Sequence, residues 1–334
     1  MRIVIDGMGG DKAPEEIIKG AVSALDSYED IELIITGIEK HLNRELNKYN
    51  FPEDRVKIIP ASEIISMNES PSKALRKKKD SSIVKGINLV KEDKATAFIS
   101  AGNTGAVMAG GLFLLGRLPS IKRPAIATVF PSRNGGTLVI DAGANVDSKP
   151  ENLNQFAIMG QIYSKHVLGV KNPRVGLLSI GEEQAKGNQL TKGAFSLLDE
   201  DKRIINFVGN VEGRDIFNGS CDVVVCDGFV GNVVLKTTEG AASYIFDLIK
   251  DTFNKNILTK LSGLMIKPFL KKQMALVDYR QYGGAPLLGV NGVVIISHGS
   301  SNSTAIKNAI KVAKETVNKN VVGLIKQEIN KDGE

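Results

Sequence analysis

Short runs of apolar, mostly β-branched residues recur along the chain and alternate with stretches of helical periodicity. Each run ends in a loop of small or polar residues, after which a helical stretch begins. Buried parallel strands have this continuous apolar character because helices cover both of their faces. The pattern therefore predicts an α/β protein with a mostly parallel sheet. The predicted strands are Ile3–Ile5, Leu33–Thr36, Val56–Ile59, Ala97–Ile99, Leu138–Ile140, Val175–Leu178, Asn206–Val208, Val223–Val225 and Val293–Ile296.

Helical spacing is clearest in two segments near the N-terminus. Apolar residues recur every three or four positions over residues 15–25, and Pro14 stands near the start, where proline is tolerated. A second apolar stripe covers residues 83–90, and either Asp80 or Ser81 can cap the helix that it predicts.

One segment departs from the alternation of strands and helices. The apolar runs 125–130 and 137–140 flank the sequence Asn-Gly-Gly at 134–136. Asn-Gly between two such runs is typical of a tight β-hairpin turn. We therefore expect a hairpin that interrupts the parallel order here.

No linker, internal repeat or low-complexity segment divides the chain. We treat residues 1–334 as a single α/β domain, with an amphipathic helical excursion at about residues 254–275. If the chain has two parts, we place their boundary near residues 145–150.

The composition, 42% hydrophobic and 24% charged, suits a globular protein with a sizeable core. The net charge of +6 favours acidic partners, but the charge is too evenly spread to indicate nucleic acid, and no zinc-finger or RNA-binding motif occurs. No window is apolar enough to span a membrane. The chain enters a strand directly after Met1, which leaves no room for a signal peptide, so we expect a cytoplasmic protein.

Cysteine usage agrees with a reducing compartment. Cys221 and Cys226 flank the apolar run Val223–Val225. No histidine cluster accompanies them, so core thiols are favoured over a disulfide or a metal pair.

Polar residues and glycines gather where the predicted strands end. In an open α/β sheet, ligands bind beyond the carboxyl ends of the strands. These residues therefore predict one functional cleft. The segments concerned are Asp6–Asp11, Ser100–Gly105, Asp141–Asn145, Gly181–Glu183, Asp227–Gly228 and His298–Ser301.

The loop Ser100–Gly105 is the best candidate for binding an anion. Its glycines let the backbone approach a ligand closely, and Thr104 with the first amides of the next helix can donate to phosphate. The alternative is an ordinary helix cap made by Asn103 or Thr104, and the residues alone favour neither interpretation.

The loop Asp6–Asp11 contains several glycines but lacks the spacing of a dinucleotide-binding loop, and its leading carboxylate would repel a pyrophosphate. Asp6 is therefore expected either to orient a donor, to hold a cation, or to cap the following helix.

His298 is the only histidine at a predicted strand end. An imidazole there can donate to a developing oxyanion or transfer a proton, and the alternative is a structural, hydrogen-bonded histidine. Asn232 and Lys236 lie one turn apart in a predicted helix and can face the same ligand.

Two surface features point to partners. The basic run Arg76, Lys77, Lys78 and Lys79 is either a solvated face or an attraction site for an acidic protein. The segment Asn254–Met274 combines leucines with lysines and contains no acidic residue. It favours contact with an anionic membrane surface over an oligomer interface, and we expect Pro268 to break it into two short helices around Gly263. The predicted membrane contacts are Leu258, Leu261, Leu264 and Lys271.

A series of motifs in this order resembles one known family. The segments are Ile5–Pro14 (IDGMGGDKAP), Ala74–Ser82 (ALRKKKDSS), Ser100–Ala106 (SAGNTGA), Asp141–Asn145 (DAGAN), Asp227–Asn232 (DGFVGN) and Ile296–Ser301 (ISHGSS). Together they resemble the phosphate acyltransferases of bacterial phospholipid synthesis, also called acyl-ACP:phosphate transacylases. The resemblance extends from the first residues to about Val322.

The resemblance implies a Rossmann-like fold related to phosphotransacetylases and to isopropylmalate-type dehydrogenases. It implies a homodimer that moves a fatty acyl group from acyl carrier protein to inorganic phosphate, without a metal or cofactor, and passes acyl phosphate to a membrane glycerol-3-phosphate acyltransferase. The enzyme would then be peripherally associated with the inner face of the cell membrane.

The positions of these residues and the resemblance together assign candidate roles. We expect Ser100, Asn103, Thr104 and Ser300 to bind phosphate, with Ser300 also able to polarise the thioester carbonyl. The candidate catalytic residues are Asp6, Asp141, Asn232 and His298. The basic run at 76–79 would receive the acidic carrier protein.

Three other functions remain open at this stage. A nicotinamide-dependent dehydrogenase would need a metal-binding aspartate cluster and a cofactor loop, which we do not find. A short-chain phosphotransacetylase using coenzyme A would not need the apolar segment at 254–274. A nonenzymatic scaffold on a membrane surface would not need so many polar strand ends.

Overall fold

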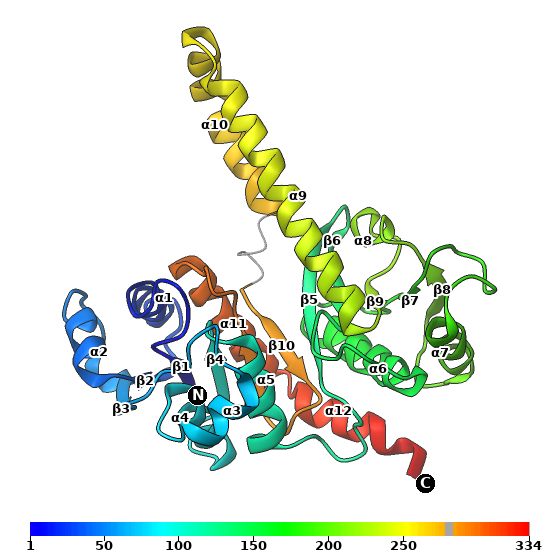
Figure 1. Cartoon of the computed structure of the whole chain (residues 1–334), viewed down its shortest axis with the longest axis horizontal. Coiled ribbons are helices and arrows are strands. Elements are labelled where there is room, and N and C mark those ends of the chain that lie inside the picture. Colours follow the sequence, from blue (N-terminus) through cyan, green and yellow to red (C-terminus); the bar gives the residue numbers. More distant parts are fainter. Residues whose placement is uncertain (278–282, 334) are drawn as a thin grey trace.

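The computed structural model of the chain describes residues 1–277 and 283–333. Its centre is a continuous 11-stranded sheet in the order β3-β2-β1-β4-β11-β10-β5-β6-β9-β7-β8 (Figure 1). Most neighbouring strands are parallel, which confirms the predicted α/β class. The strands are β1 (Arg2–Asp6), β2 (Glu32–Gly37), β3 (Val56–Pro60), β4 (Ala97–Ser100), β5 (Ala125–Ser132), β6 (Gly135–Ile140), β7 (Val175–Leu178), β8 (Phe207–Val211), β9 (Val223–Val225), β10 (Ala285–Leu288) and β11 (Val293–Ile296).

The helices follow the strands much as the apolar periodicity predicts. Every apolar position expected for the first helix is buried, and Ser81 caps the helix that begins at Ser82. The helices are α1 (Glu15–Leu25), α2 (Glu39–Leu46), α3 (Pro71–Lys77), α4 (Ser82–Lys91), α5 (Thr104–Gly110), α6 (Pro150–His166), α7 (Gln189–Glu200), α8 (Asp215–Asn218), α9 (Gly228–Asn254), α10 (Ile257–Val277), α11 (Ser303–Asn318) and α12 (Val321–Ile329). A π-helical turn, η2 (Gly111–Leu115), continues α5.

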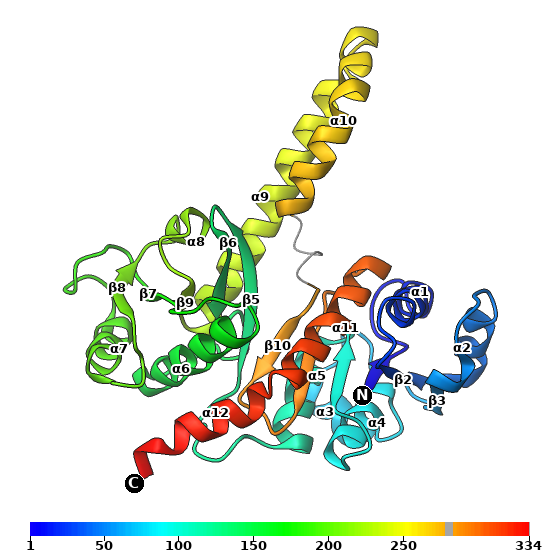
Figure 2. The same cartoon turned by 180° about the vertical axis from the view of Figure 1, so that it is seen from behind.

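Helices cover both faces of the sheet, because successive strand residues point to opposite sides. In β1, Val4 packs into one apolar cluster with α4 and α5, whereas Ile3 and Ile5 pack into another with α1 and α11. A third cluster joins β6, β7 and β9 to α6, α7 and α12. Figure 2 shows α11 and α12 passing along the molecule from one half of the sheet to the other.

The sheet reverses direction in the middle. Strand β10 is antiparallel to both β11 and β5, and β5 is antiparallel to β6. The carboxyl ends of β1, β4 and β11 therefore lie at one edge of the sheet, and those of β6, β9 and β7 lie at the opposite edge. The polar strand ends therefore do not share one edge of the sheet, and the expectation that they form one cleft stays a prediction.

The hairpin predicted around residues 134–136 is confirmed as β5 and β6. The sequence did not reveal β10, a four-residue strand that pairs on both sides. It contains Pro286, and proline is rare in the interior of a sheet because it cannot donate to the ladder. Because β10 is antiparallel to both neighbours, β5 again runs in the direction of β11, and the reversal that persists through β6, β9, β7 and β8 comes from the β5–β6 hairpin.

The helices α9 and α10 form a hairpin that projects from the body of the molecule (Figure 1). We call this hairpin the arm. The predicted break at Pro268 is wrong, because α10 runs without interruption from Ile257 to Val277. Contact with α9 supports it: a Cβ atom placed on Gly263 would lie 2.9 Å from the ring of Phe253, so the helices approach closely there. Such tertiary contacts override the local preference of proline.

Two further expectations can be compared with the fold. Among the residues that the structure describes, no helix is long and apolar enough to cross a membrane. Both Cys221 and Cys226 are buried and unpaired, and burial raises the pKa of the Cys221 thiol to about 12. The prediction of core thiols is therefore confirmed, while the single domain over residues 1–334 stays a prediction.

The crossing of α1 and α11 depends on the absence of a side chain at Gly20. A Cβ atom there would lie 2.6 Å from Cβ of Ile306 and 2.7 Å from the carbonyl oxygen of Ser303. We expect Gly20→Ala to lower the free energy of unfolding by about 2 kcal/mol, because the core is already filled. Urea unfolding followed by circular dichroism measures the change.

Gly240 provides the matched control, because it also lies in a helix but has open space around its Cβ position. Gly240→Ala should leave stability unchanged or raise it by up to about 1 kcal/mol through helix propensity. Equal effects of the two substitutions would contradict the close packing of α1 on α11.

Candidate active site

Glycine-rich loops from β1, β4 and β11 meet at one edge of the sheet. The amide of Asp11 donates to the carbonyl of Gly299 at 2.8 Å, and the amide of Ser297 donates to the carbonyl of Ser100 at 2.8 Å. Gly9 lies so close to the next loop that a Cβ atom there would lie 2.6 Å from the nitrogen of Gly102. Only glycine permits this approach, so the glycines of the first loop serve packing between loops.

Buried hydrogen bonds of Asp6 and Ser100 link these loops. The Ser100 hydroxyl donates to Asp6 at 2.7 Å and accepts from the Gly102 amide at 3.0 Å. Asp6 also accepts from the Met8 amide at 3.1 Å. Burial raises the pKa of Asp6, and hydrogen bonds from Ser82 and Ser100 act against that shift. Both side chains are buried, so they organise the loops that surround the cleft.

The side chain of Asn103 is engaged at both of its ends. Its oxygen accepts from the Ala106 amide at 2.9 Å and so caps α5. Its nitrogen donates to the carbonyls of Ser66, Met67 and Glu69 at 3.0 to 3.1 Å. Both amide hydrogens are therefore used, and the structure corrects Asn103 from a phosphate ligand to a cap that holds the loop at 66–69. The next residue, Thr104, is exposed.

Asp141 organises a second loop, at the end of β6. One of its oxygens accepts from the amides of Ile126, Gly143 and Ala144, and the other accepts from the backbone and side-chain nitrogens of Asn145. Burial raises the pKa of Asp141, against hydrogen bonds that include those from Ala144 and Asn145. This carboxylate has no exposed oxygen, so it holds the loop rather than a substrate.

The N-terminus of α9 packs directly on this second loop. A Cβ atom on Gly231 would lie 1.9 Å from the carbonyl oxygen of Asp141, and one on Gly228 would lie 2.5 Å from the carbonyl oxygen of Asn145. The two glycines lie three positions apart, on one face of the helix. The spacing of the segment Asp227–Asn232 therefore follows from close contact between a helix and a loop.

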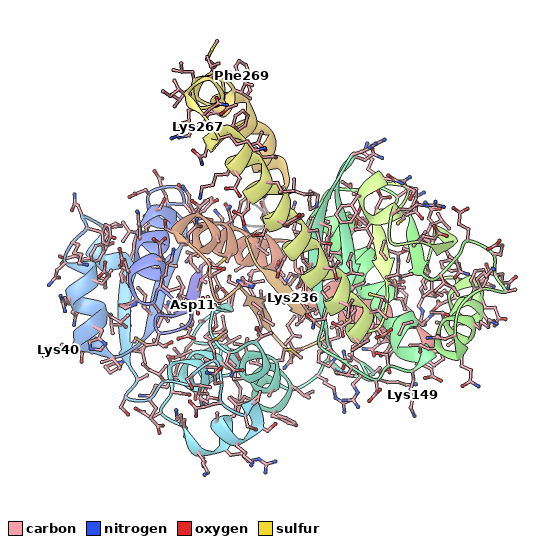
Figure 3. All side chains as sticks on the ribbon, turned by 45° about the horizontal axis from the view of Figure 1, so that its top comes forward. Asp11, Lys40, Lys149, Lys236, Lys267 and Phe269 are labelled. Carbon is pink, nitrogen blue, oxygen red and sulfur yellow. The ribbon has the colours of Figure 1, made fainter. Side chains whose placement is uncertain are left out.

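From this contact, α9 runs toward the carboxyl end of β11 and brings Lys236 to His298. Lys236 Nζ lies 3.5 Å from Nε2 of His298 and 2.8 Å from Oε2 of Glu239. Oε2 of Glu239 is 4.0 Å from Nε2 of His298, whose Nδ1 is 2.8 Å from the Ser300 hydroxyl. Figure 3 shows Lys236 and Asp11 on opposite sides of this central region.

The structure thus brings together only part of the predicted set. His298, Ser300 and Lys236 form an exposed polar cluster, and Asn232 lies one turn earlier on α9, beside Gly143. Sequence reasoning missed Glu239. Its position three residues after Lys236 on a helix is the signal that could have indicated it.

Clusters of charged side chains can also bind metal ions. Within residues 1–277 and 283–333, no group of three or more His, Cys, Asp or Glu side chains is arranged to hold a metal ion.

Comparison with known proteins assigns the chain to a family. A family model described as "Fatty acid synthesis protein" matches residues 1–324. The phosphate acyltransferase of Desulfitobacterium hafniense is 54% identical over 98% of this chain and 98% of its own length. This chain belongs to the phosphate acyltransferases. It is therefore an acyltransferase of lipid synthesis.

Solved structures of other enzymes resemble the fold of this phosphate acyltransferase. A phosphotransacetylase from Streptococcus pyogenes aligns with a TM-score of 0.59 at 18% identity, covering 94% of each chain. A 4-hydroxythreonine-4-phosphate dehydrogenase from Salmonella typhimurium aligns with a TM-score of 0.50 at 13% identity, covering 94% of this chain and 98% of its own. At such identities the likeness concerns the fold alone.

The surface residues predicted for partners of this phosphate acyltransferase lie in different settings. Arg76, Lys77 and Lys79 are exposed on or just after α3. Lys78 instead bonds Glu69 and the carbonyl of Ile64, both at 2.6 Å, so it holds the same loop as Asn103. The structure removes Lys78 from the predicted contact surface.

On the arm, the predicted apolar contacts are exposed. Leu258, Leu261 and Leu264 of α10 are exposed to 77%, 56% and 65%. The side chain of Lys271 lies outside the described residues.

The double role of Asn103 can be divided by substitution. Asn103→Asp keeps an oxygen that can cap α5 but replaces the amide nitrogen, the donor to three carbonyls, by a second carboxylate oxygen. Asn103→Ala loses both the cap and the donor. We expect each variant to lower the free energy of unfolding by about 1 to 3 kcal/mol, because the carbonyls of the loop at 66–69 lose their shared donor. Chemical denaturation measures the loss.

Amide hydrogen exchange then separates the two contacts. In Asn103→Asp the Ala106 amide should stay protected while the loop at 66–69 exchanges faster. A variant with wild-type stability and wild-type exchange in that loop would contradict the positioning role.

Proposed function

We propose that this enzyme transfers a fatty acyl group from acyl carrier protein to inorganic phosphate and so forms acyl phosphate for phosphatidic acid and phospholipid synthesis. The observation that carries the proposal is the exposed cluster of His298, Ser300 and Lys236 at the edge of the glycine loops. It offers cationic and hydrogen-bonding groups for a phosphate and for the carbonyl oxygen of a thioester.

In the reaction, a phosphate oxygen attacks the thioester carbonyl carbon. The carbon–sulfur bond breaks, its electron pair leaves with the sulfur, and the carrier thiolate takes up the proton that hydrogen phosphate releases as it becomes acyl phosphate. Phosphate is already an anion at neutral pH, so positioning and charge stabilisation supply most of the catalysis. We assign Lys236, Ser300 and Thr104 to phosphate, because each is exposed beside this edge of the sheet.

One hydrogen bond of His298 determines which tautomer a neutral ring adopts. The Ser300 amide donates to Nδ1 at 3.2 Å, so Nδ1 carries no hydrogen and a neutral ring carries its proton on Nε2. That atom faces Lys236 and Glu239. We assign His298 to the developing oxyanion or to the leaving sulfur, with Asn232 as a second donor. Asp6 and Asp141 become positioning residues, since their oxygens are buried.

We also assign the arm to an anionic membrane surface. Apolar side chains of α10 are exposed to 77% at Leu258 and 74% at Phe269, and Lys260 and Lys267 are exposed among them. Figure 3 shows Lys267 and Phe269 projecting from the arm. Basic apolar helices bind anionic lipid surfaces in this way. The enzyme would then act in the cytoplasm at the inner face of the membrane, near the glycerol-3-phosphate acyltransferase that uses its product; the homodimer stays a prediction.

The reaction is tested by incubating the purified enzyme with palmitoyl-acyl carrier protein and phosphate and trapping the product with hydroxylamine. Palmitoyl hydroxamate should form only with phosphate, together with free carrier thiol. Lys236→Met should lower kcat by about a hundredfold, because a charge that stabilises the transition state is lost. Lys250→Met, on the same helix and exposed, is the control and should keep the wild-type rate.

Other outcomes of this assay would redirect the assignment. Product with acetyl coenzyme A but not with the carrier protein would make the enzyme a short-chain phosphotransacetylase. Wild-type activity in Lys236→Met would remove the cluster around His298 from the mechanism.

Membrane contact is tested by flotation with vesicles that contain anionic lipid. Leu258→Glu with Leu261→Glu should shift most of the protein from the floating to the soluble fraction, because both side chains would carry charge into the acyl layer. Ile205→Glu with Val208→Glu removes exposed apolar side chains elsewhere and should float like the wild type. Unchanged flotation of the folded arm variant would refute the contact.

A further inference from the structure

A pocket lined by cations lies away from the cluster around His298. Its volume is about 620 Å³, and we call it the basic pocket. The cations are Arg117, Lys122, Arg123 and Lys149, and the remaining lining residues are Leu112, Phe113, Asp147 and Asn152. The cations come from the loop before β5 and from the end of the loop before α6.

Contacts with the rest of the chain hold the loop before β5 firmly in place. Leu118 and Ile121 are buried beneath it, and the Leu118 amide donates to the carbonyl of Gly289 at 3.0 Å. Arg117 donates to the carbonyl of Lys122 at 2.6 Å, and the Lys122 amide donates to Gln155 at 2.8 Å. The cations are thus presented from an anchored backbone rather than from a loose one.

The charges of the basic pocket are not balanced within the chain. Among the described residues, none of its four cations forms an ion pair, and Asp147 is the only carboxylate in the lining. The lining therefore has a surplus of three positive charges. Like charges gathered at one concave surface raise the local potential and attract an anionic partner.

Two features favour a protein partner over a small anion. All four cations are exposed, as suits long-range attraction of a charged surface, whereas a small anion is usually enclosed by buried donors. Large apolar side chains flank them, with Phe113 exposed to 67% and Val146 to 68%. Arginines beside an exposed aromatic ring are typical of protein–protein contacts.

The position of the basic pocket suits a partner that arrives from solution. In Figure 3, Lys149 lies at the opposite end of the molecule from Lys267 and Phe269 of the arm. One loop connects the basic pocket to the candidate active site. It begins at Asp141, where it packs against the start of α9, and it ends at Lys149 in the pocket lining.

We propose that the basic pocket is the docking surface for the acidic protein that delivers the acyl chain. This inference rests on the proposed function and identifies where its protein substrate binds. In this proposal the basic pocket makes the main electrostatic contact with the carrier protein, and the exposed cations at the end of α3 do not.

The test uses steady-state rates with palmitoyl-acyl carrier protein at varied concentration. Lys122→Glu, Arg123→Glu and Lys149→Glu are combined, since no described hydrogen bond or ion pair holds these three side chains in the fold. The triple variant should raise the KM for the carrier by about tenfold or more and weaken its dependence on salt. The kcat at saturating carrier and the KM for phosphate should stay within about twofold, because docking precedes the chemical step.

Two further triple variants carry the same change of charge. The first variant combines Lys19→Glu, Lys40→Glu and Arg44→Glu on α1 and α2, away from both basic surfaces. It should keep the wild-type KM. Arg76→Glu, Lys77→Glu and Lys79→Glu test the rival surface on α3. A KM increase confined to the α3 variant, or equal in all three variants, would overturn the proposal.

Circular dichroism confirms that each variant is folded before its rates are compared. Wild-type turnover of the carrier substrate is measured first. If the wild type does not use the carrier at all, the proposed function fails. If it does and the pocket variant keeps its KM, only the docking surface is refuted.

Discussion

The close contact between the start of α9 and the loop after β6 positions most of the candidate active site. Gly231 lies against the carbonyl of Asp141 and Gly228 against that of Asn145, with no room for any side chain. This contact sets the direction in which α9 leaves the sheet. That direction carries Lys236 and Glu239 to His298 and then supports the arm. The glycines of the helix therefore determine the geometry of a site to which they contribute no side chain.

Two buried aspartates do equivalent work at opposite edges of the sheet. Asp6 gathers the loops of β1 and β4, and Asp141 gathers the loop of β6 through five hydrogen bonds. Because burial opposes ionisation of both, each depends on its donors to remain a stable part of the core. The site is thus built from rigid loops, with its exposed groups added by β11 and α9. Such rigidity suits a reaction that relies on positioning.

The sequence predicted the strands, the hairpin and the first helices because each depends on local apolar periodicity. It did not predict that polar strand ends would divide between two edges, since that depends on which strands pair in the middle of the sheet, where β10 joins β11 to the β5–β6 hairpin. Pro286 hides β10 as a central strand. Residue type was enough to select His298 and Ser300 as candidates, because their position at a strand end is a local property. It did not distinguish Asn103 and Asp141 as positioning residues, because their roles depend on partners distant in sequence, such as the loop at 66–69 and Ile126. Pro268 was misjudged for the same reason, because α10 packs on α9, with the close approach at Gly263 and Phe253.

The length of α9 sets the distance between the polar cluster and the tip of the arm. From Lys236 to Asn254 the helix advances by 18 residue steps, which is about 27 Å at the rise of an α-helix. A single continuous helix thus joins the polar cluster to the tip of the arm as a spacer of fixed length. A surface that meets the tip of the arm therefore lies at most about 27 Å from the cluster. A product released there has water to cross before it reaches that surface, and the stiffness of α9 keeps the gap constant.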